Sequence, residues 1–276
     1  MTERRGIWNN GGRVRIVTIA QNAPGPVAVS RLVAGGARAV KIEPPWGDQL
    51  AALSPVWYDE LHVGVDIERL DLKSTAGQAR LGELLGAADV FLASHRPSAL
   101  QRLGLDAIAL HKRFPALRHV NIVGDIANPE EPGHDLTYLA RAGLLGRDMP
   151  LTLFADMAGA ERAGAAITEV MHQPGGVRVV GLYDVLRELA APLRHGLTLG
   201  GGRLGGGNPA YAVYDTKEGT IAVAALEPHF RSALYEGLGL ADGADLRAVF
   251  LDRTAEEWEQ WAKERDVPLA RCQTPS

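Results

Sequence analysis

The sequence predicts an α/β protein with a doubly wound, mostly parallel sheet and a second, smaller α+β domain. Three observations support this prediction. Apolar strand-like runs alternate with helical patterns over the first half of the chain, the pattern changes to helices and then a hairpin after Gly124, and the 276 residues exceed the usual size of one core.

The first half of the chain contains three successive β-α-β cycles. The predicted elements are strand 13–20, helix 24–36, strand 37–43, helix 74–88, strand 89–94, helices 97–105 and 106–114, and strand 118–124. Helices that connect parallel strands cover both faces of the sheet, so this part is expected to be Rossmann-like.

The second half is predicted to be helical and then partly β. The predicted elements are helices 135–146, 156–173 and 182–193, a glycine-rich loop 196–211, a hairpin 210–226 turning at 217–219, and helices 228–240 and 254–266. We therefore expect a large α/β domain over residues 1–195 and a small domain over residues 196–251. The last residues, 252–276, are expected to return to the large domain.

Composition excludes several classes of partner. The formal net charge is -4 and the sequence pI is about 6.1, which gives no general attraction for nucleic acid or an anionic membrane. The chain has one cysteine, Cys272, which cannot form an intrachain disulfide and suits a reducing compartment. No apolar run reaches the length of about 18 residues that a membrane helix needs. These features predict a cytoplasmic protein without nucleic-acid or membrane partners.

Common cofactor motifs are absent from the sequence. The turn after the first strand, "QNAPGPVAVS", lacks the G-x-G-x-x-G pattern, and there is no P-loop, H-E-x-x-H, C-x-x-C or G-x-S-x-G motif. We therefore expect neither a permanently bound cofactor nor a metal ion.

Two stretches carry candidate catalytic residues. "PGHDLTYLA" places His134 beside Asp135 before a helical run, and "LFADMAGA" places Asp156 at the start of a helix rich in small residues. Asp135 and Asp156 could each be a helix cap, and His134 could be an exposed loop histidine. Alternatively, Asp156 and His134 could act on a substrate held at the positive end of a helix.

A longer succession of stretches resembles a known family. These stretches are "RLVAGGARAVKIEPPWGD", "LDLKSTAGQARLGELLGAADVFLASHRPSALQRLGL", "GHDLTYLARAGLL", "LTLFADMAGA", "GGGNPAYAVYDTKEGTIAVAALEPHF" and "RTAEEWEQWAKERDVPLA". In this order they resemble the family III CoA-transferases (CaiB/BaiF). The chain is most similar to the α-methylacyl-CoA racemase branch, and it is shorter at the C-terminus.

The resemblance implies specific catalytic roles. Asp156 would be the nucleophile in a transferase and an acid/base group in a racemase. In a racemase His134 would be the second acid/base group, and Glu227 in "LEPHF", from the other chain of an intertwined homodimer, would raise the basicity of His134.

The implied reaction is a 1,1-proton transfer at the α-carbon of a 2-methylacyl-CoA through an enolate, with coenzyme A as part of the substrate. One base removes the proton and an acid on the other face returns it. Backbone N–H groups at the start of the Asp156 helix would be the donors to the enolate oxygen. The alternative is CoA transfer between carboxylic acids through an aspartyl intermediate at Asp156, which does not require His134.

The resemblance also indicates residues that contact CoA. Arg96 occupies the family's "RP" turn, and Arg38 and Lys41 flank the second strand, where a solvated strand end is the simpler interpretation. Gly205 and Gly206 lie in a loop like the glycine loop that covers the reacting aspartate in family transferases. This loop could equally be a linker.

The chain also departs from the family pattern. His62 and Val63 stand where polar and basic residues near CoA are expected, and Glu130 and Glu131 add negative charge before the "GHD" motif. Together with the shorter C-terminus, these departures motivate a third possibility, a member that binds an acyl-CoA without turnover.

Overall fold

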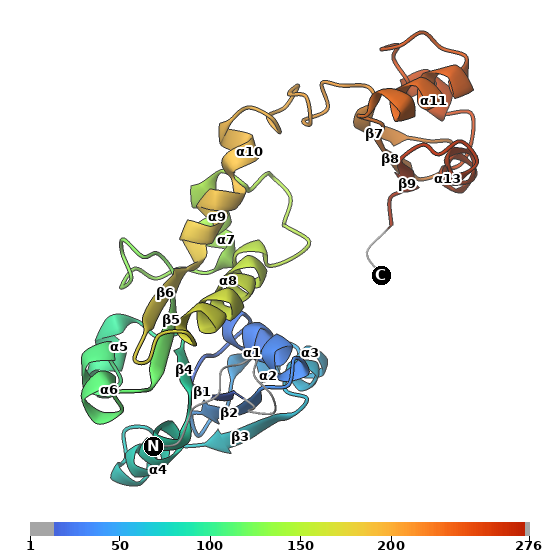
Figure 1. Cartoon of the computed structure of the whole chain (residues 1–276). Coiled ribbons are helices and arrows are strands. Elements are labelled where there is room, and N and C mark those ends of the chain that lie inside the picture. The colour runs from blue at the N-terminus through green and yellow to red at the C-terminus, as the bar shows by residue number, and fades with distance from the viewer. Residues whose placement is uncertain (1–13, 274–276) are drawn as a thin grey trace. The chain divides into compact units, whose positions relative to one another are not determined.

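The structure, a computed structural model, describes residues 14–273 (Figure 1). The chain divides into two compact units, Met1–Ala190 and Ala191–Ser276. The division lies close to the predicted boundary before residue 196, and each unit is described by itself below.

The first unit is built on a six-stranded parallel sheet. Its strands are β1 (Arg15–Thr18), β2 (Arg38–Glu43), β3 (Val65–Arg69), β4 (Val90–Ala93), β5 (Arg118–Val123) and β6 (Val177–Gly181). They lie in the order β3-β2-β1-β4-β5-β6, and every neighbouring pair is parallel. The chain reverses its direction of winding between β1 and β4, so the predicted Rossmann-like, doubly wound topology is confirmed.

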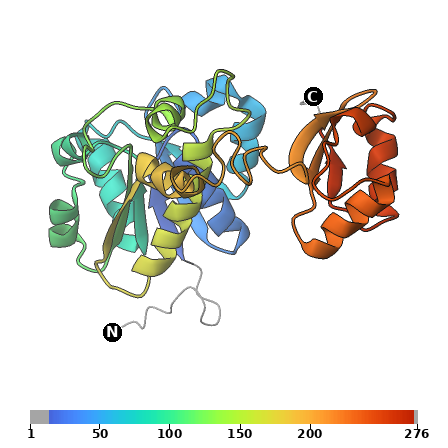
Figure 2. The same cartoon turned by 90° about the horizontal axis from the view of Figure 1, so that it is seen from above.

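Helices cover both faces of this sheet (Figure 2). One core contains residues of α1 (Pro24–Ala34), α7 (Asp135–Ala142), α8 (Phe154–Val170) and α9 (Leu182–Leu189), and it also reaches α2 (Gln49–Leu53) and α3 (Pro55–Leu61). The other core contains residues of α4 (Thr75–Ala87), α5 (Pro97–Arg102) and α6 (Ala107–Arg113). Strands β4 and β5 are buried along their whole length, as expected for strands between two helical layers.

The two edge strands of the sheet were not predicted. β3 has the sequence "VDIER" and β6 has "VRVVG", and both include exposed residues. An edge strand with charged residues lacks the continuous apolar run that identifies a buried parallel strand. The sequence therefore indicates the four central strands more clearly than the edges.

The second unit contains an antiparallel sheet in the order β7-β8-β9. Its elements are α10 (Ala191–Arg194), β7 (Tyr211–Asp215), β8 (Thr220–Ala224), α11 (Pro228–Leu238), α12 (Arg247–Phe250), α13 (Ala255–Lys263) and β9 (Leu269–Arg271). β7 and β8 form the predicted hairpin, in which Thr216 N–H donates to the Gly219 carbonyl at 3.0 Å.

The predicted return of residues 252–276 to the large domain differs from the structure. β9 pairs with β8, and Trp258 and Trp261 of α13 are buried in the same core as Phe250 and Ile221. The hairpin alone would leave a strand edge unpaired and an apolar face uncovered, and these residues satisfy both needs. The described part of the 252–276 segment therefore belongs to the second unit.

None of the helices between residues 14 and 273 combines the length and the apolar character needed to cross a membrane.

Candidate active site

A cavity of about 280 Å³ lies at the carboxyl ends of β1, β4 and β5. It is lined by the turn after β1 (Gln21, Asn22 and Pro24), the loop after β4 (Ser94, His95 and Arg96), the segment before α7 (Gly133 and His134), and by Tyr138 and Asp156. The strand order reverses between β1 and β4, so the cavity occupies the place where open α/β sheets bind their ligands.

The turn between β1 and α1 forms one wall of this cavity. Gln21 N–H donates to Ser94 Oγ at 3.1 Å, and Asn22 N–H donates to the Asp48 carboxylate at 3.2 Å. Asn22 has a φ of 62°, a left-handed conformation that Asn tolerates better than most residues. The turn is therefore held by side chains from the loop after β4 and from the β2–α2 loop, without a dinucleotide-binding glycine pattern.

His134 lies immediately before α7 and lines the cavity. Its side chain is exposed, and its backbone N–H donates to Thr137 Oγ1 at 3.0 Å. The preceding residue must be small, because a Cβ on Gly133 would lie 2.6 Å from Cζ of Tyr138. Packing of the Tyr138 ring thus fixes the backbone that carries His134.

Asp135 caps a different helix from the one that was expected. Its Oδ1 accepts the backbone N–H groups of Ala155 (2.6 Å) and Asp156 (3.1 Å), in the first turn of α8. The interpretation of Asp135 as the cap of its own helix is therefore wrong. A buried carboxylate on α7 instead holds the start of the helix that carries Asp156.

Asp156 is the third residue of α8, so it is not the cap of that helix; Leu153 occupies the N-cap position. The side chain is half-buried and lines the cavity. Burial, together with the negative charge of Asp135, raises the pKa of Asp156 to about 7. A carboxyl group with this pKa can both give and accept a proton near neutral pH.

Two of the expected donors for an enolate oxygen are already engaged. We expected backbone N–H groups at the start of α8 to serve this purpose, but those of Ala155 and Asp156 donate to Asp135. Their hydrogen bonds hold Asp156 in place and leave them unavailable to a substrate.

Arg96 lines the same cavity as His134 and Asp156, and it directly precedes α5. Glu130 accepts from Ser98 N–H (2.7 Å) and Ser98 Oγ (2.8 Å) at the start of α5, and Glu131 pairs with Arg141 at 3.4 Å. The two acidic residues of the "NPEEPG" stretch therefore have partners, so their charge is partly compensated.

Arg38 and Lys41 do not lie where a CoA site was expected. Arg38 is the exposed first residue of β2 and so lies at the amino end of the sheet, away from the cavity. Lys41 is only 1% exposed and is bound to Asp48 and Glu43, so it is not a solvated strand end. Neither cation is free at the surface of the cavity.

The remaining predicted residues belong to the second unit. Glu227 precedes α11, and its side chain is exposed and makes no cap hydrogen bond. Gly205 and Gly206 lie in a loop folded on itself, in which Gly201 N–H donates to the Gly205 carbonyl at 3.0 Å. Gly206 has a φ of 85°, and a Cβ on Gly205 would overlap the Leu199 carbonyl oxygen.

His95 also lines the cavity and was not predicted from the sequence, although it stands next to Arg96 in "SHRP". Burial lowers the pKa of His95, so its ring is neutral at pH 7. The ring Nδ1 is buried with no hydrogen-bond partner among the described residues. Its position directly after a buried strand was the available signal, because such positions reach the carboxyl edge of a parallel sheet.

The fold and the cavity together define an α/β protein with a half-buried carboxyl group of raised pKa at the switch point of a parallel sheet. The family description "CoA-transferase family III" matches residues 12–170, more than half of the chain. The chain therefore belongs to CoA-transferase family III and is an enzyme of that family.

The relatives of this chain include two kinds of enzyme. It is 29% identical over 301 residues to human alpha-methylacyl-CoA racemase, covering 95% of this chain and 76% of the relative. It is 26% identical over 324 residues to cinnamoyl-CoA:phenyllactate CoA-transferase of Clostridium sporogenes, with coverages of 95% and 77%.

Solved structures share the fold. The crystal structure of Rv3272 from Mycobacterium tuberculosis has a TM-score of 0.80 at 23% identity, covering 95% of this chain and 84% of that one. A CAIB/BAIF family protein from Brucella suis has a TM-score of 0.77 at 20% identity, with coverages of 95% and 83%. At these identities the likeness establishes the fold alone.

Proposed function

We propose that the chain is an α-methylacyl-CoA racemase-like enzyme that catalyses 1,1-proton transfer at the α-carbon of a 2-methylacyl-CoA. The observation that carries the proposal is that His134 and Asp156 line one cavity, where the pKa of Asp156 is raised to about 7. Epimerisation needs two groups that exchange a proton near neutral pH, and imidazole and a carboxyl group of raised pKa meet this need.

The reaction requires a group on each face of the α-carbon. One of His134 and Asp156, in its basic form, removes the α-proton, and the electron pair of the broken C–H bond moves into the thioester to give an enolate. The other group, in its acidic form, donates a proton to the opposite face and restores the thioester with inverted configuration. After one turnover the first group carries a proton and the second has lost one. Exchange of protons with water restores the starting protonation states before the next substrate of the same configuration reacts.

The second candidate is CoA transfer between carboxylic acids through an aspartyl intermediate at Asp156. The similarity of the chain to cinnamoyl-CoA:phenyllactate CoA-transferase favours this second function. The sequence identity and coverage of that comparison are close to those of the comparison with the racemase. A nucleophile must be an unprotonated carboxylate, whereas burial and the charge of Asp135 raise the pKa of Asp156 and favour its protonated form. This protonation behaviour suits an acid/base role better than a nucleophilic one.

The proposal includes a homodimer and a CoA contact at Arg96. Arg96 on the cavity wall would bind a phosphate of the substrate, because guanidinium groups bind phosphate in a bidentate manner. Glu227 of the partner subunit would support His134, and Gly205 and Gly206 would belong to a loop that approaches the substrate. Size-exclusion chromatography with light scattering tests whether the wild type and Glu227→Gln both form a dimer. The epimerisation assay then tests whether loss of the carboxylate lowers the activity of the Glu227→Gln dimer.

The test follows the epimerisation of (2R)-2-methylacyl-CoA by four variants of the protein, with the epimers separated by chiral chromatography. We expect His134→Ala and Asp156→Asn to lower the rate by about 10²- to 10⁴-fold, the usual contribution of a positioned acid or base. His172→Ala and Glu169→Gln are matched controls, because these exposed residues lie in the last turn of α8 or just after it, at the opposite end from Asp156. CoA exchange between carboxylic acids that survives His134→Ala but not Asp156→Asn would favour the transferase.

A further inference from the structure

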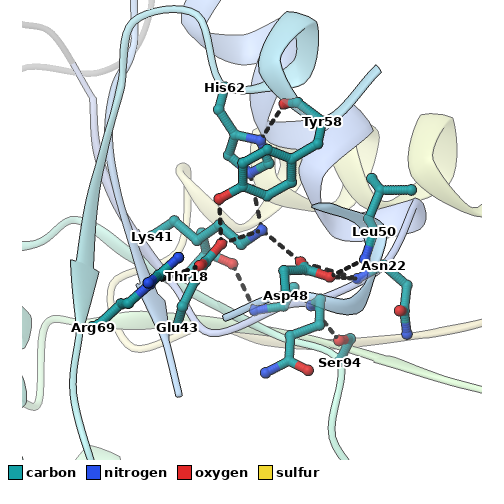
Figure 3. A network of polar contacts seen from close by, with 12 residues as sticks. Thr18, Asn22, Lys41, Glu43, Asp48, Leu50, Tyr58, His62, Arg69 and Ser94 are labelled. Carbon is teal, nitrogen blue, oxygen red and sulfur yellow. Dashed lines mark hydrogen bonds and ion pairs between the residues drawn. The ribbon is translucent and has the colours of Figure 1, made fainter. Parts of the chain in front are cut away.

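A buried polar network lies beside the cavity, around Lys41 (Figure 3). The Lys41 ammonium contacts Asp48 Oδ2 at 2.6 Å, His62 Nε2 at 2.9 Å and Glu43 Oε1 at 3.2 Å. An ammonium group has three N–H donors, so these three contacts use all of them. Tyr58 Oη also donates to Glu43 Oε1 at 2.6 Å.

The hydrogen bonds of His62 define its tautomer. His62 Nδ1 lies 2.6 Å from the Tyr58 carbonyl oxygen, and a carbonyl can only accept, so Nδ1 carries the proton. Nε2 is then the acceptor for Lys41. Burial is the main cause that lowers the pKa of His62, and the Lys41 ammonium adds to it. His62 is therefore a neutral acceptor that completes the surroundings of Lys41.

Asp48 connects this network to the cavity. Both of its carboxylate oxygens lie 3.2 Å from Asn22 N, and Oδ1 also accepts Leu50 N–H at 2.9 Å as the cap of α2. Asn22 lines the cavity, and its left-handed φ of 62° is unfavourable for a residue with a Cβ. An acceptor that is itself fixed by Lys41 holds this turn in its conformation.

We infer that Lys41 and Asp48 are positioning residues for the candidate active site, because they hold Asn22 in the turn that lines the cavity. This inference rests on the proposed function, since the turn forms the wall of the cavity that contains His134 and Asp156. A buried ion pair is by itself weak evidence of a stabilising role, because desolvation offsets much of the attraction. The contact of Asp48 with the cavity-lining N–H of Asn22 gives the buried Lys41–Asp48 ion pair a positioning role instead.

The test replaces Asp48 by a residue that keeps the helix cap but loses the bridge between Lys41 and Asn22. In Asp48→Ser the hydroxyl still caps α2, since serine is a favourable N-cap, but it is too short to bridge Lys41 and Asn22. We expect a fall in kcat of about tenfold to a hundredfold with a much smaller change in KM, because the wall near the reacting groups is displaced. We also expect Asn22 N–H to exchange faster with deuterated water, as measured by NMR.

Asp89→Ser is the matched control. Asp89 likewise accepts a backbone N–H of the β1 region, from Arg15 at 3.0 Å, and pairs with the Arg15 side chain, but it does so at the amino end of the strand. This variant should leave both kcat and Asn22 exchange unchanged. If Asp48→Ser does not fold because the buried Lys41 ammonium has lost its partner, the double variant Lys41→Met/Asp48→Ser removes that charge. We expect the same changes in kcat and in Asn22 exchange for the double variant.

Two results separate this inference from the proposed function. Wild-type-like kcat and wild-type-like Asn22 exchange in the folded Asp48 variant would overturn the positioning role. If the wild type catalyses neither epimerisation nor CoA transfer, the proposed function fails, and Asn22 exchange alone then decides whether the pair holds the turn. Unchanged exchange in the variant would overturn the inference in that case too.

Discussion

At the scale of single residues, Asp135 performs two functions with one carboxylate. It accepts two N–H groups of α8, which orients the helix start, and its negative charge contributes to the raised pKa of Asp156. The sequence showed both acids but not this relation. Twenty-one residues separate them, and only the packing of α7 against α8 brings them together.

Replacing Asp135 by Asn should lower the pKa of Asp156. The amide oxygen can still accept the α8 N–H groups, but the nearby negative charge is gone, so the ionised form of Asp156 becomes easier to reach. Because burial is the larger cause, the pKa should fall below about 7 yet stay above its ordinary value. A ¹³C NMR titration of the aspartate carboxyls measures it, with Asp156→Asn to assign the signal; an unchanged pKa would contradict the role of Asp135.

His119 should make the protein less stable in mild acid. It is buried on β5, neither ring nitrogen has a partner among the described residues, and burial lowers its pKa to about 4. Between pH 6.5 and about 4 the unfolded chain binds a proton that the folded chain does not, so stability falls as the pH falls, by about 1.4 kcal/mol per pH unit. Urea unfolding at several pH values should show a shallower dependence for His119→Leu, whereas His172→Leu, at an exposed site, should behave like the wild type.

At the scale of elements, the sequence predicts helices and strands with a regular apolar pattern, but not contacts between segments that are distant in the chain. The buried central strands and their crossover helices follow from apolar periodicity, and so does the position of His134 and Asp156 near helix starts. The environment of Lys41 could not be predicted in this way. It depends on Asp48, which precedes α2, and on His62, which follows α3; both contact Lys41 of β2 in the folded chain.

The close packing of Tyr138 against the segment before α7 makes Gly133 sensitive to substitution. In Gly133→Ala the added Cβ would lie 2.6 Å from both Cζ and Oη of Tyr138, so the ring or the backbone must move. We expect a loss of about 1–3 kcal/mol in the free energy of unfolding, together with reduced activity because His134 is displaced. Gly146→Ala is the control, since nothing lies within 4 Å of a Cβ there; equal urea midpoints for the two variants would refute the packing argument.

At the scale of the whole molecule, the chain consists of two units with separate cores. The parallel sheet and its helices form the first unit, whereas the second unit buries Trp258 and Trp261 against its own hairpin. The division at Ala190 lies a few residues before the glycine-rich stretch that suggested a boundary. The position of α13 and β9 in the second unit could not be predicted, because an amphipathic helix does not specify which of two cores it covers.

The second unit should fold by itself only when its last elements are included. A fragment of residues 191–276 contains the whole three-stranded sheet and its core, whereas 191–251 lacks β9 and both buried tryptophans of α13. We expect cooperative thermal unfolding by circular dichroism for the longer fragment and none for the shorter one. Cooperative folding of 191–251 would show that α13 and β9 are dispensable to this unit.

The central claim, that His134 and Asp156 exchange a proton with the α-carbon of an acyl-CoA, is tested most directly by deuterium uptake. The wild-type protein is incubated with (2R)-2-methylacyl-CoA in deuterated water, and the recovered thioester is analysed by mass spectrometry and chiral chromatography. We expect deuterium at the α-carbon together with formation of the (2S) epimer, and the loss of both in Asp156→Asn. Recovery of unlabelled (2R) thioester across a panel of acyl chains would contradict it.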